Sequence, residues 1–464
     1  MFCQEKSAFL KVGKEEQARA KAFCEGYKEF LDKAKTEREA VDYARGFAKA
    51  NGFAPFESGA ELKAGDRVYL ENRGKAMAFA VIGEQPMEQG VNIIAAHVDS
   101  PRLDLKQNPI YEDSGLALFK THYYGGIKKY QWMAIPLALH GVAVTKTCTV
   151  KVSIGEDASE PVFTITDLLP HLAEEQMKKK ASEFIEGEAL NILIGSEISM
   201  SNEQLGISND GGNSQERISD SVKKNILVIL KQKYGIEEED FVSSELCIVP
   251  AGGARDVGLD CSFVGGYGQD DRVCSYTALT ALASASAPKR TAVLFLADKE
   301  EVGSMGNTGM KSTFFYEFIR GLAPSDNLHI ILSNSQCLSA DVGAAWDPTY
   351  KDVMEKNNAP QLNHGLMISK YAGSRGKSGS SDANAEFVGK VRNIFNEAGV
   401  AWQTGELGKV DAGGGGTVAQ YIANLNVDVL DCGVPLLSMH SPFEIAAKLD
   451  IYMAYKGYSA FYKS

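Results

Sequence analysis

The sequence predicts an α/β fold in which one domain is interrupted by a β-rich insert. Residues 91–96 and 292–297 form short apolar runs without polar alternation, which is typical of strands covered on both faces. Strands and helices alternate outside residues 105–250, whereas many short β segments at turn spacing occur inside that range. We therefore expect an α/β domain over residues 1–104 and 251–464 and a separate insert over residues 105–250.

Composition and charge exclude several classes of partner. The 464 residues are 44% hydrophobic, and the length alone suggests about two to three domains. A net charge of −12 without a basic stripe argues against nucleic acid and anionic membranes as partners. The chain lacks a signal-peptide pattern and any apolar run of roughly 20 residues, so we expect a cytoplasmic protein with no membrane contact. The eight cysteines form no Cys-x-x-Cys pair and are expected to be reduced thiols.

The first elements are expected to form a scaffold. Residues 14–51 have helical periodicity in two pieces, and the capping-box pattern Thr36-Glu-Arg-Glu39 lies between the pieces. Gly52 follows the second piece, as expected at the end of a helix. Residues 66–83 have the pattern of a β-hairpin.

A polar pair ends the next strand. His97 and Asp99 follow the apolar run at 91–96, and residues two apart share a face of an extended segment. Asp99 can therefore orient the imidazole of His97 and strengthen it as a metal ligand. A histidine after a strand is as often purely structural, so both interpretations stay open at this point.

The insert is expected to consist mainly of β structure with polar excursions at its surface. Its predicted elements are strands at 115–120, 123–127, 132–145 and 149–154, surface excursions at 174–188 and 202–217, a helix at 219–234, and a solvated acidic loop at 237–240.

Adjacent carboxylates occur at two places in the second half. Asp270 and Asp271 precede a small-residue helix predicted at 274–287, where acidic residues also serve as partners of the helix dipole. Glu300 and Glu301 follow the apolar run at 292–297. Neighbouring carboxylates repel each other unless a local positive charge, such as a metal ion, holds them together. A solvated loop is the alternative interpretation of the two glutamates.

Two further polar residues are predicted near strand ends. Asp341 lies beyond a strand predicted at 329–333, and His440 lies beyond a strand predicted at 427–431. The ligand sites of open α/β sheets lie just outside the carboxyl ends of their strands. We therefore expect both residues near the same edge of the sheet.

These positions define one set of candidate metal ligands, the donor set. Each member is expected at the end of a strand, in the loop after a strand, or just before a helix. The set consists of His97, Asp270, Glu301, Asp341 and His440. Imidazole nitrogen and carboxylate oxygen are ligands that zinc, cobalt and manganese accept, and one carboxylate can bridge two ions. The sequence therefore predicts a site for two divalent metal ions, zinc first among them, with a water molecule activated between them.

Five motifs occur in this order: His97-Val-Asp-Ser-Pro, Gln269-Asp-Asp-Arg, Lys299-Glu-Glu-Val-Gly-Ser, Ser339-Ala-Asp and Ser438-Met-His-Ser-Pro. Together they resemble the aspartyl aminopeptidase and vacuolar aminopeptidase I family of dinuclear zinc metallopeptidases. The resemblance implies a zinc-exopeptidase-like α/β/α catalytic domain that hydrolyses N-terminal residues from peptides. It also implies that the donor set holds the metals with Asp270 as the bridge, that Asp99 orients His97, and that Glu300 is the general base and acid.

The same resemblance implies features of the assembly and of the substrate pocket. The insert would serve oligomerisation, or act as a lid, in a homo-oligomeric dodecamer, and His171 of Asp167-Leu-Leu-Pro-His171 would reach a neighbouring active site. Lys370 lies in the segment that resembles the substrate pocket, and the bond between Asp270 and Asp271 is expected to be cis. Many relatives have Leu-Asp-Asn where this chain has Gln269-Asp-Asp, which leaves the role of Asp271 open. The segment around Lys370 and Tyr371 matches the substrate pocket only loosely, which leaves the preferred N-terminal residue open.

Two other functions are alternatives. A metal-dependent deacylase or carboxypeptidase would use a similar ligand set on a substrate with a blocked amine or a free C-terminus. A non-enzymatic scaffold would bind an anion or nucleotide at the glycine run 413–416 before a predicted helix. That run lacks the Gly-Lys-Ser/Thr of a phosphate-binding loop and leaves the carboxylates unexplained.

Overall fold

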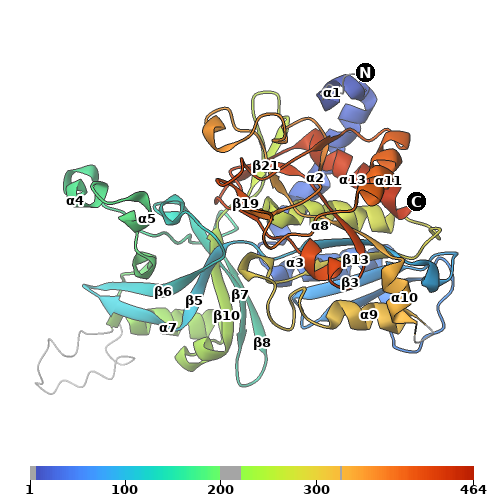
Figure 1. Ribbon diagram of the computed structural model, residues 1–464. Coiled ribbons are helices and arrows are strands. Elements are labelled where there is room, and N and C mark those ends of the chain that lie inside the picture. The colour runs from blue at the N-terminus through green and yellow to red at the C-terminus, as the bar shows by residue number, and fades with distance from the viewer. Residues whose placement is uncertain (1–6, 199–220, 324–326) are drawn as a thin grey trace, which may run out of the picture. The chain divides into compact units, whose positions relative to one another are not determined.

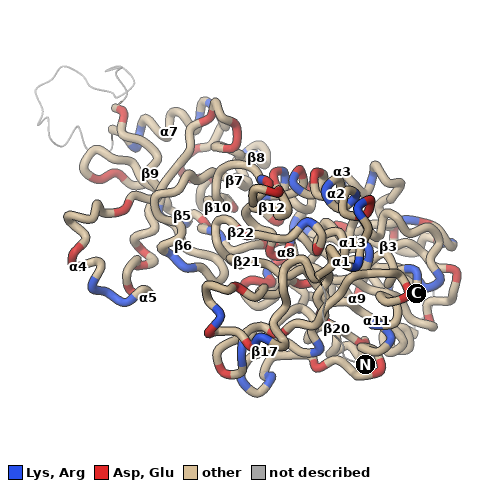
Figure 2. Tube along the Cα trace, turned by 90° about the horizontal axis from the view of Figure 1, so that it is seen from above, with Lys and Arg blue, Asp and Glu red and all other residues tan. Residues whose placement is uncertain are grey.

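The computed structural model describes residues 7–198, 221–323 and 327–464, and the chain divides into two compact units (Figure 1). Unit 1 comprises Met1–Ser100 and Gly253–Ser464, and unit 2 comprises Pro101–Gly252. The boundaries expected from the sequence lay after residue 104 and before residue 251. Lysine, arginine, aspartate and glutamate are interspersed along the described residues of both units (Figure 2).

A nine-stranded sheet organises unit 1, with strand order β1-β2-β3-β13-β4-β14-β20-β16-β18. The four strands β13, β4, β14 and β20 run parallel to one another at its centre. The predicted hairpin is confirmed as the antiparallel pair β2–β3. The strands are β1 Ala54–Pro55, β2 Arg67–Asn72, β3 Ala76–Val81, β4 Asn92–His97, β13 Ala292–Ala297, β14 Gln336–Ser339, β16 Leu366–Ser369, β18 Trp402–Thr404 and β20 Asp428–Gly433.

Both faces of this sheet are covered, because alternate side chains of its central strands enter two different cores. In β13, Leu294 and Leu296 belong to one core, whereas Val293 and Phe295 belong to the other. The first core also contains side chains of α2 Lys14–Lys33, α3 Glu37–Ala50, α8 Gln269–Ala283, α11 Ala385–Glu397 and α13 Lys448–Tyr462, together with Ala8 of α1 Ala8–Lys11. The second contains side chains of α9 Phe314–Leu322, α10 Leu328–Ser333 and α12 Ala419–Ala423. The expected α/β/α layering is therefore confirmed (Figure 1).

Unit 1 also contains a five-stranded sheet of order β11-β12-β22-β21-β15. Its strands are β11 Arg255–Val257, β12 Phe263–Gly266, β15 Gly343–Ala344, β21 Pro435–Leu437 and β22 Glu444–Ala447. The loop after β12 leads into α8, and the loop between β21 and β22 contains His440. The short elements of unit 1 are β17 Gly373–Ser374, β19 Gly414–Gly415, and the 3-10 turns η1 Met87–Gln89, η6 Glu300–Val302 and η7 Lys351–Val353.

Unit 2 is built on a six-stranded antiparallel sheet of order β8-β7-β10-β5-β6-β9. The buried Trp132, Phe119 and Phe241 are among the largest side chains of its core. Its strands are β5 Arg102–Asp113, β6 Leu116–Tyr124, β7 Leu137–Val144, β8 Thr149–Ile154, β9 Ile192–Gly195 and β10 Ser244–Pro250. The helices and turns are α4 Glu174–Met177, α5 Ala181–Phe184, α7 Ser221–Tyr234, η2 Lys129–Trp132, η3 Pro170–Leu172, η4 Gly187–Ala189 and η5 Glu238–Ser243.

Several element predictions need correction. The segment 329–333 is not a strand but belongs to helix α10, because Leu328, Ile331 and Leu332 are buried at helical spacing. The acidic segment 237–240 is only partly the predicted solvated loop: residues 237–239 are exposed, but Asp240 is buried in the turn η5 and its carboxylate accepts the backbone N–H of Glu237 at 2.8 Å.

Element boundaries also differ from the predictions. Helix α8 begins at Gln269 rather than at residue 274 and ends at Ala283 rather than at residue 287. Strand β6 ends at Tyr124, and the segment predicted as one strand from residue 132 becomes the turn η2 followed by β7. The surface excursion predicted at 202–217 lies outside the described residues.

Candidate metal centre

Neighbouring parallel strands bring the polar residues of three segments to one edge of the main sheet. His97 is the last residue of β4 and lies opposite Ala297, the last residue of β13. Ser339, the last residue of β14, lies opposite Ala95 of β4. The segments that follow β13 and β14 therefore start at the same edge, and these segments carry the paired glutamates and Asp341.

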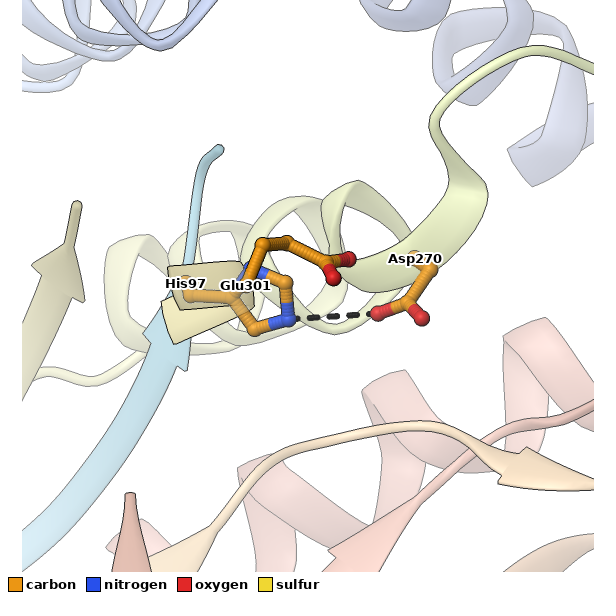
Figure 3. Close-up of side chains that lie close together, drawn as sticks. All are labelled: His97, Asp270 and Glu301. Atoms are coloured by element: carbon orange, nitrogen blue, oxygen red, sulfur yellow. Dashed lines mark hydrogen bonds and ion pairs between the residues drawn. The ribbon is translucent and has the colours of Figure 1, made fainter. Parts of the chain in front are cut away.

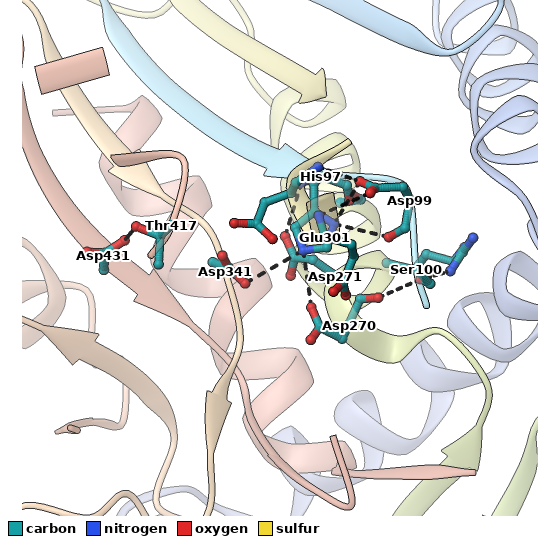
Figure 4. Close-up of polar contacts among 12 residues, drawn as sticks. His97, Asp99, Ser100, Asp270, Asp271, Glu301, Asp341, Thr417 and Asp431 are labelled. Carbon is teal, nitrogen blue, oxygen red and sulfur yellow. Dashed lines mark hydrogen bonds and ion pairs between the residues drawn. The ribbon is translucent and has the colours of Figure 1, made fainter. Parts of the chain in front are cut away.

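His97 is buried, with only 1% of its surface exposed, and its two ring nitrogens face different partners. Nδ1 lies 3.1 Å from the backbone oxygen and 3.3 Å from Oδ1 of Asp99. Nε2 lies 3.1 Å from Oδ1 of Asp270 and 3.8 Å from Oδ1 of Asp341 (Figure 4). Asp99 thus fixes the ring so that Nε2 points at the other carboxylates.

Asp270 lies between the two imidazoles. Its Oδ1 atom is 3.1 Å from Nε2 of His97, and its Oδ2 atom is 3.1 Å from Nε2 of His440. The residue lies in a non-helical kink at the start of α8, and the bond between Asp270 and Asp271 is cis, as predicted. His97, Asp270 and Glu301 lie close together (Figure 3).

The adjacent glutamates are held by a single carboxylate. Both lie on η6, and the two oxygens of Asp99 accept the backbone N–H groups of Glu300 at 3.1 Å and Glu301 at 3.2 Å. The side chain of Glu301 reaches His440, with 3.5 Å between Oε1 and Nε2. Asp99 therefore positions the glutamate pair as well as His97, a role that its place in the sequence did not indicate.

Two further buried carboxylates contact this cluster. The sequence analysis left the role of one of them, Asp271, open and did not predict the other, Glu444. Asp271 is fully buried, and its Oδ2 atom accepts the backbone N–H of His97 at 3.3 Å. Glu444 is 1% exposed and accepts the backbone N–H groups of His440 at 2.7 Å and Asp270 at 3.2 Å. Asp271 adjoins a motif residue, but Glu444 follows His440 by four positions on a strand, a spacing that carries no recognised signal.

Burial and imidazole contacts shift the pKa values of the cluster in opposite directions. Burial favours the neutral form of Asp270, but the hydrogen bonds from His440 and His97 outweigh it and hold the pKa of Asp270 well below its usual range. Burial disfavours the charged form of His97, yet the contacts with Asp270 and Asp99 raise its pKa well above the ordinary value.

The remaining carboxyl groups are dominated by burial. Burial raises the pKa of Glu301 and of Asp341 well above their ordinary values, and the charge of Asp270 adds to the rise at Glu301. Burial raises the pKa of Glu300 to about 7. A cation among these groups would favour their ionised forms, because it would replace repulsion between carboxylates with attraction.

This donor set fits a divalent cation. Oε1 of Glu301 is buried and has no hydrogen-bond partner among the described residues, which is unfavourable unless another group satisfies that oxygen. Two groups of three side chains each have one ligand atom apiece within 4.8 Å of one another: His97 with Asp270 and Glu301, and His97 with Glu300 and Asp341. Both groups offer only nitrogen and oxygen, which suits zinc, cobalt or manganese.

Two further predicted site residues belong to other segments of the chain. Lys370 forms an ion pair with Asp382, which Lys377 also contacts. His171 belongs to η3 in unit 2 and is exposed. Within unit 1 the structure therefore brings together the predicted donors and Asp99, whereas Lys370 contacts Asp382.

Residues 30–462 match the family described as Aminopeptidase I zinc metalloprotease (M18). The chain belongs to the M18 family. A protein of Clostridium acetobutylicum named "Probable M18 family aminopeptidase 1" is 50% identical over 467 residues, which cover 98% of this chain and 97% of that protein. A protein of Thermotoga maritima with the same name is 47% identical over 446 residues, or 94% of each chain.

Solved structures of aminopeptidases have the same fold. The crystal structure of aminopeptidase I from Clostridium acetobutylicum matches with a TM-score of 0.91 and 47% identity over 100% of both chains. A structure described as the S. cerevisiae mApe1 dodecamer matches with a TM-score of 0.74 and 20% identity over 97% of each chain. The predicted family and fold class are thus confirmed, and the scaffold, deacylase and carboxypeptidase alternatives are not favoured. Among the described residues, no helix is both long and apolar enough to cross a membrane.

Proposed function

We propose that this M18 protein is a dinuclear zinc aminopeptidase that removes N-terminal residues from peptides. The observation that supports two ions is the position of Asp270, whose two carboxylate oxygens each lie 3.1 Å from a different imidazole. A carboxylate that faces two nitrogen donors in this way is suited to bridge two cations. Cobalt and manganese accept the same donors and are the alternative metals.

The proposed ligands divide into two sets that share Asp270. His97 and Asp341 complete one set, because Nε2 of His97 lies 3.8 Å from Oδ1 of Asp341. His440 and Glu301 complete the other set, with 3.5 Å between Nε2 and Oε1. When bound, the ions would lower the pKa of a water molecule and polarise the peptide carbonyl.

Glu300 is the proposed acid–base residue. It would take a proton from the attacking water and deliver it to the nitrogen of the leaving amine. Burial favours the protonated form of Glu300, whereas bound cations would favour the ionised form that accepts a proton. Both glutamates come within reach of the donor cluster, so the division of roles follows the family resemblance and is testable.

Metal content tests the proposal directly. The purified protein is expected to contain two zinc ions per chain by elemental analysis, and chelation should abolish hydrolysis of aminoacyl amides. Zinc, cobalt or manganese should restore it. His440→Ala should lose metal, whereas His364→Ala should not, because Nδ1 of His364 instead faces the backbone oxygen of Leu362 at 3.0 Å. Full activity of a verified metal-free protein would contradict the proposal.

The substrate test separates the proposed activity from related ones. Amides with a free α-amine should be cleaved, and the same amides with an acylated amine should not. Preferential cleavage of the acylated amides, or release of C-terminal residues, would favour a deacylase or a carboxypeptidase. A panel of N-terminal residues in the same assay would show which one is preferred.

Assembly and substrate contacts complete the proposal. Unit 2 exposes apolar side chains that a second copy could cover, with exposed fractions of 51, 50, 68 and 69% for Leu168, Leu169, Leu172 and Met177. We expect a homo-oligomer, with the dodecamer as the specific case, and light scattering would give its mass. His171 and Lys370 are the proposed substrate contacts. The cytoplasm is the expected location, since all seven described cysteines are free.

A further inference from the structure

Glu444 is a buried acidic side chain that joins two segments of the cluster. Its Oε1 atom accepts the backbone N–H of His440 at 2.7 Å, and its Oε2 atom accepts the backbone N–H of Asp270 at 3.2 Å. The residue is only 1% exposed. One carboxylate therefore holds the main chain of both residues whose side chains face each other at 3.1 Å.

The main chain of both segments adopts uncommon conformations. His440 and Ser438 have φ values of 64° and 57°, which are uncommon for residues with a β-carbon. Asp270 has non-helical dihedral angles within the first turn of α8. Conformations of this kind persist only where surrounding contacts hold them, and Glu444 supplies a hydrogen bond to each segment.

Glu444 is itself anchored in a sheet. It is the first residue of β22 and lies opposite Gly266, the last residue of β12. The backbone oxygen of Glu444 accepts a hydrogen bond from Nε2 of Gln269 at 2.6 Å, and Gln269 immediately precedes Asp270. Its carboxylate is therefore held by a rigid element rather than by a loop.

We infer that Glu444 is a positioning residue that sets the placement of His440 relative to Asp270, and thereby the affinity of the metal site that these two share. The inference rests on the proposed ligand roles of His440 and Asp270. The positioning role requires two acceptor atoms in the side chain at position 444, because the N–H groups of His440 and Asp270 point at different oxygens. An amide of the same shape has one acceptor, and its NH2 group would face a backbone donor.

The test is the zinc affinity of Glu444→Gln, measured on metal-free protein by competition with a chromogenic chelator. Loss of an outer hydrogen-bond partner typically weakens metal binding by about 10–100-fold, and we expect a loss of that size. The two zinc ions are expected to bind in two steps. Glu444→Gln should weaken the step that is absent in His440→Ala, whereas the step that is absent in His97→Ala should change less. Excess zinc should restore the activity of Glu444→Gln.

Asp450→Asn is the matched control. Asp450 is also a buried carboxylate that accepts two backbone N–H groups, from Asn363 at 2.6 Å and Gly365 at 2.7 Å. Those donors belong to a different segment of the chain, so Asp450→Asn should lower thermal stability and leave zinc affinity unchanged. An equal loss of zinc affinity in both variants would overturn the inference, as would unchanged affinity in Glu444→Gln.

The ligand variants separate this inference from the proposed function. If His97→Ala and His440→Ala keep their zinc, the proposed ligand roles fail. If those variants lose zinc while Glu444→Gln keeps wild-type affinity, only the role of Glu444 fails. Should Glu444→Gln not fold, Glu444→Asp replaces it, because the shorter side chain keeps the charge but cannot reach both donors, and the same weakening is expected.

Discussion

At the scale of single residues, Glu300 and Glu301 are neighbours with different surroundings. Oε1 of Glu301 lies 3.5 Å from Nε2 of His440, and that oxygen is buried without a hydrogen-bond partner among the described residues. Asp99 accepts the backbone N–H groups of both glutamates. Asp99 therefore holds the backbone of both glutamates, and their two side chains can perform different tasks.

Exchange of each glutamate for glutamine should separate these tasks. Glu300→Gln should keep its metal and lose at least about 10²-fold in kcat, because positioned acid–base catalysis typically contributes 10²- to 10⁴-fold. Glu301→Gln should lose metal affinity instead, since it removes a charged ligand. Elemental analysis and steady-state kinetics measure both effects. A metal-depleted Glu300→Gln beside a fully loaded Glu301→Gln would reverse the two assignments.

The sequence predicts the candidate metal ligands, but not which carboxylates hydrogen-bond to their main chain. His97 and Glu301 could be predicted because they lie at or beyond the ends of correctly predicted strands, and the carboxyl ends of parallel strands meet at one edge. Asp341 was expected at that edge because of a strand predicted at 329–333, but that segment is helix α10, and the strand before Asp341 is β14. Glu444 could not be predicted, because its function depends on the distance between two loops that are remote in sequence. Asp271 was left open for the same reason: its partner is the backbone of His97.

At the scale of elements, helix α3 illustrates a local signal that the structure reproduces. Oγ1 of Thr36 accepts the backbone N–H of Glu39 at 3.2 Å, and Oε2 of Glu39 accepts the backbone N–H of Thr36 at 3.0 Å. Both partners lie within one turn, so the sequence alone specifies the contact. Helix α10 shows the opposite case, because a short apolar run does not distinguish a strand from a helix.

Thr36→Ala should lower the free energy of unfolding by about 1 kcal/mol, the typical cost of removing a helix-capping hydroxyl. Urea denaturation followed by circular dichroism measures this change. Thr36→Ser keeps the hydroxyl and is the control for the lost methyl group, since Thr36 is buried. Zinc content should be the same in both variants. Equal stability of the alanine and serine variants would show that the capping hydrogen bond contributes nothing measurable.

At the scale of the whole molecule, the insert and the α/β unit carry different parts of the proposed site. The alternation of strands and helices made the α/β/α unit predictable, and the dense short strands made the β-rich insert predictable. In the proposed role, the exposed His171 of unit 2 would act through contacts between copies of the chain. Its proposed role is therefore a statement about assembly.

Mixing of inactive subunits tests that role. His171→Phe and Glu300→Gln should each be inactive alone. Mixed oligomers should regain part of the activity, because some active sites would combine an intact Glu300 with an intact His171 from a neighbouring copy. Light scattering must first show that each variant assembles like the wild type. No recovery in verified mixed oligomers would contradict action across the interface.

The two imidazoles that face Asp270 lie at positions 97 and 440, so they leave the ribosome at very different times during translation. No single short segment of the chain contains all the proposed metal ligands. A nascent chain can therefore offer single ligands to a metal ion but not the closed site, which exists only after β4, β13 and β14 have paired. Zinc loading would then follow folding, and the free zinc available to finished chains would decide how many copies become active.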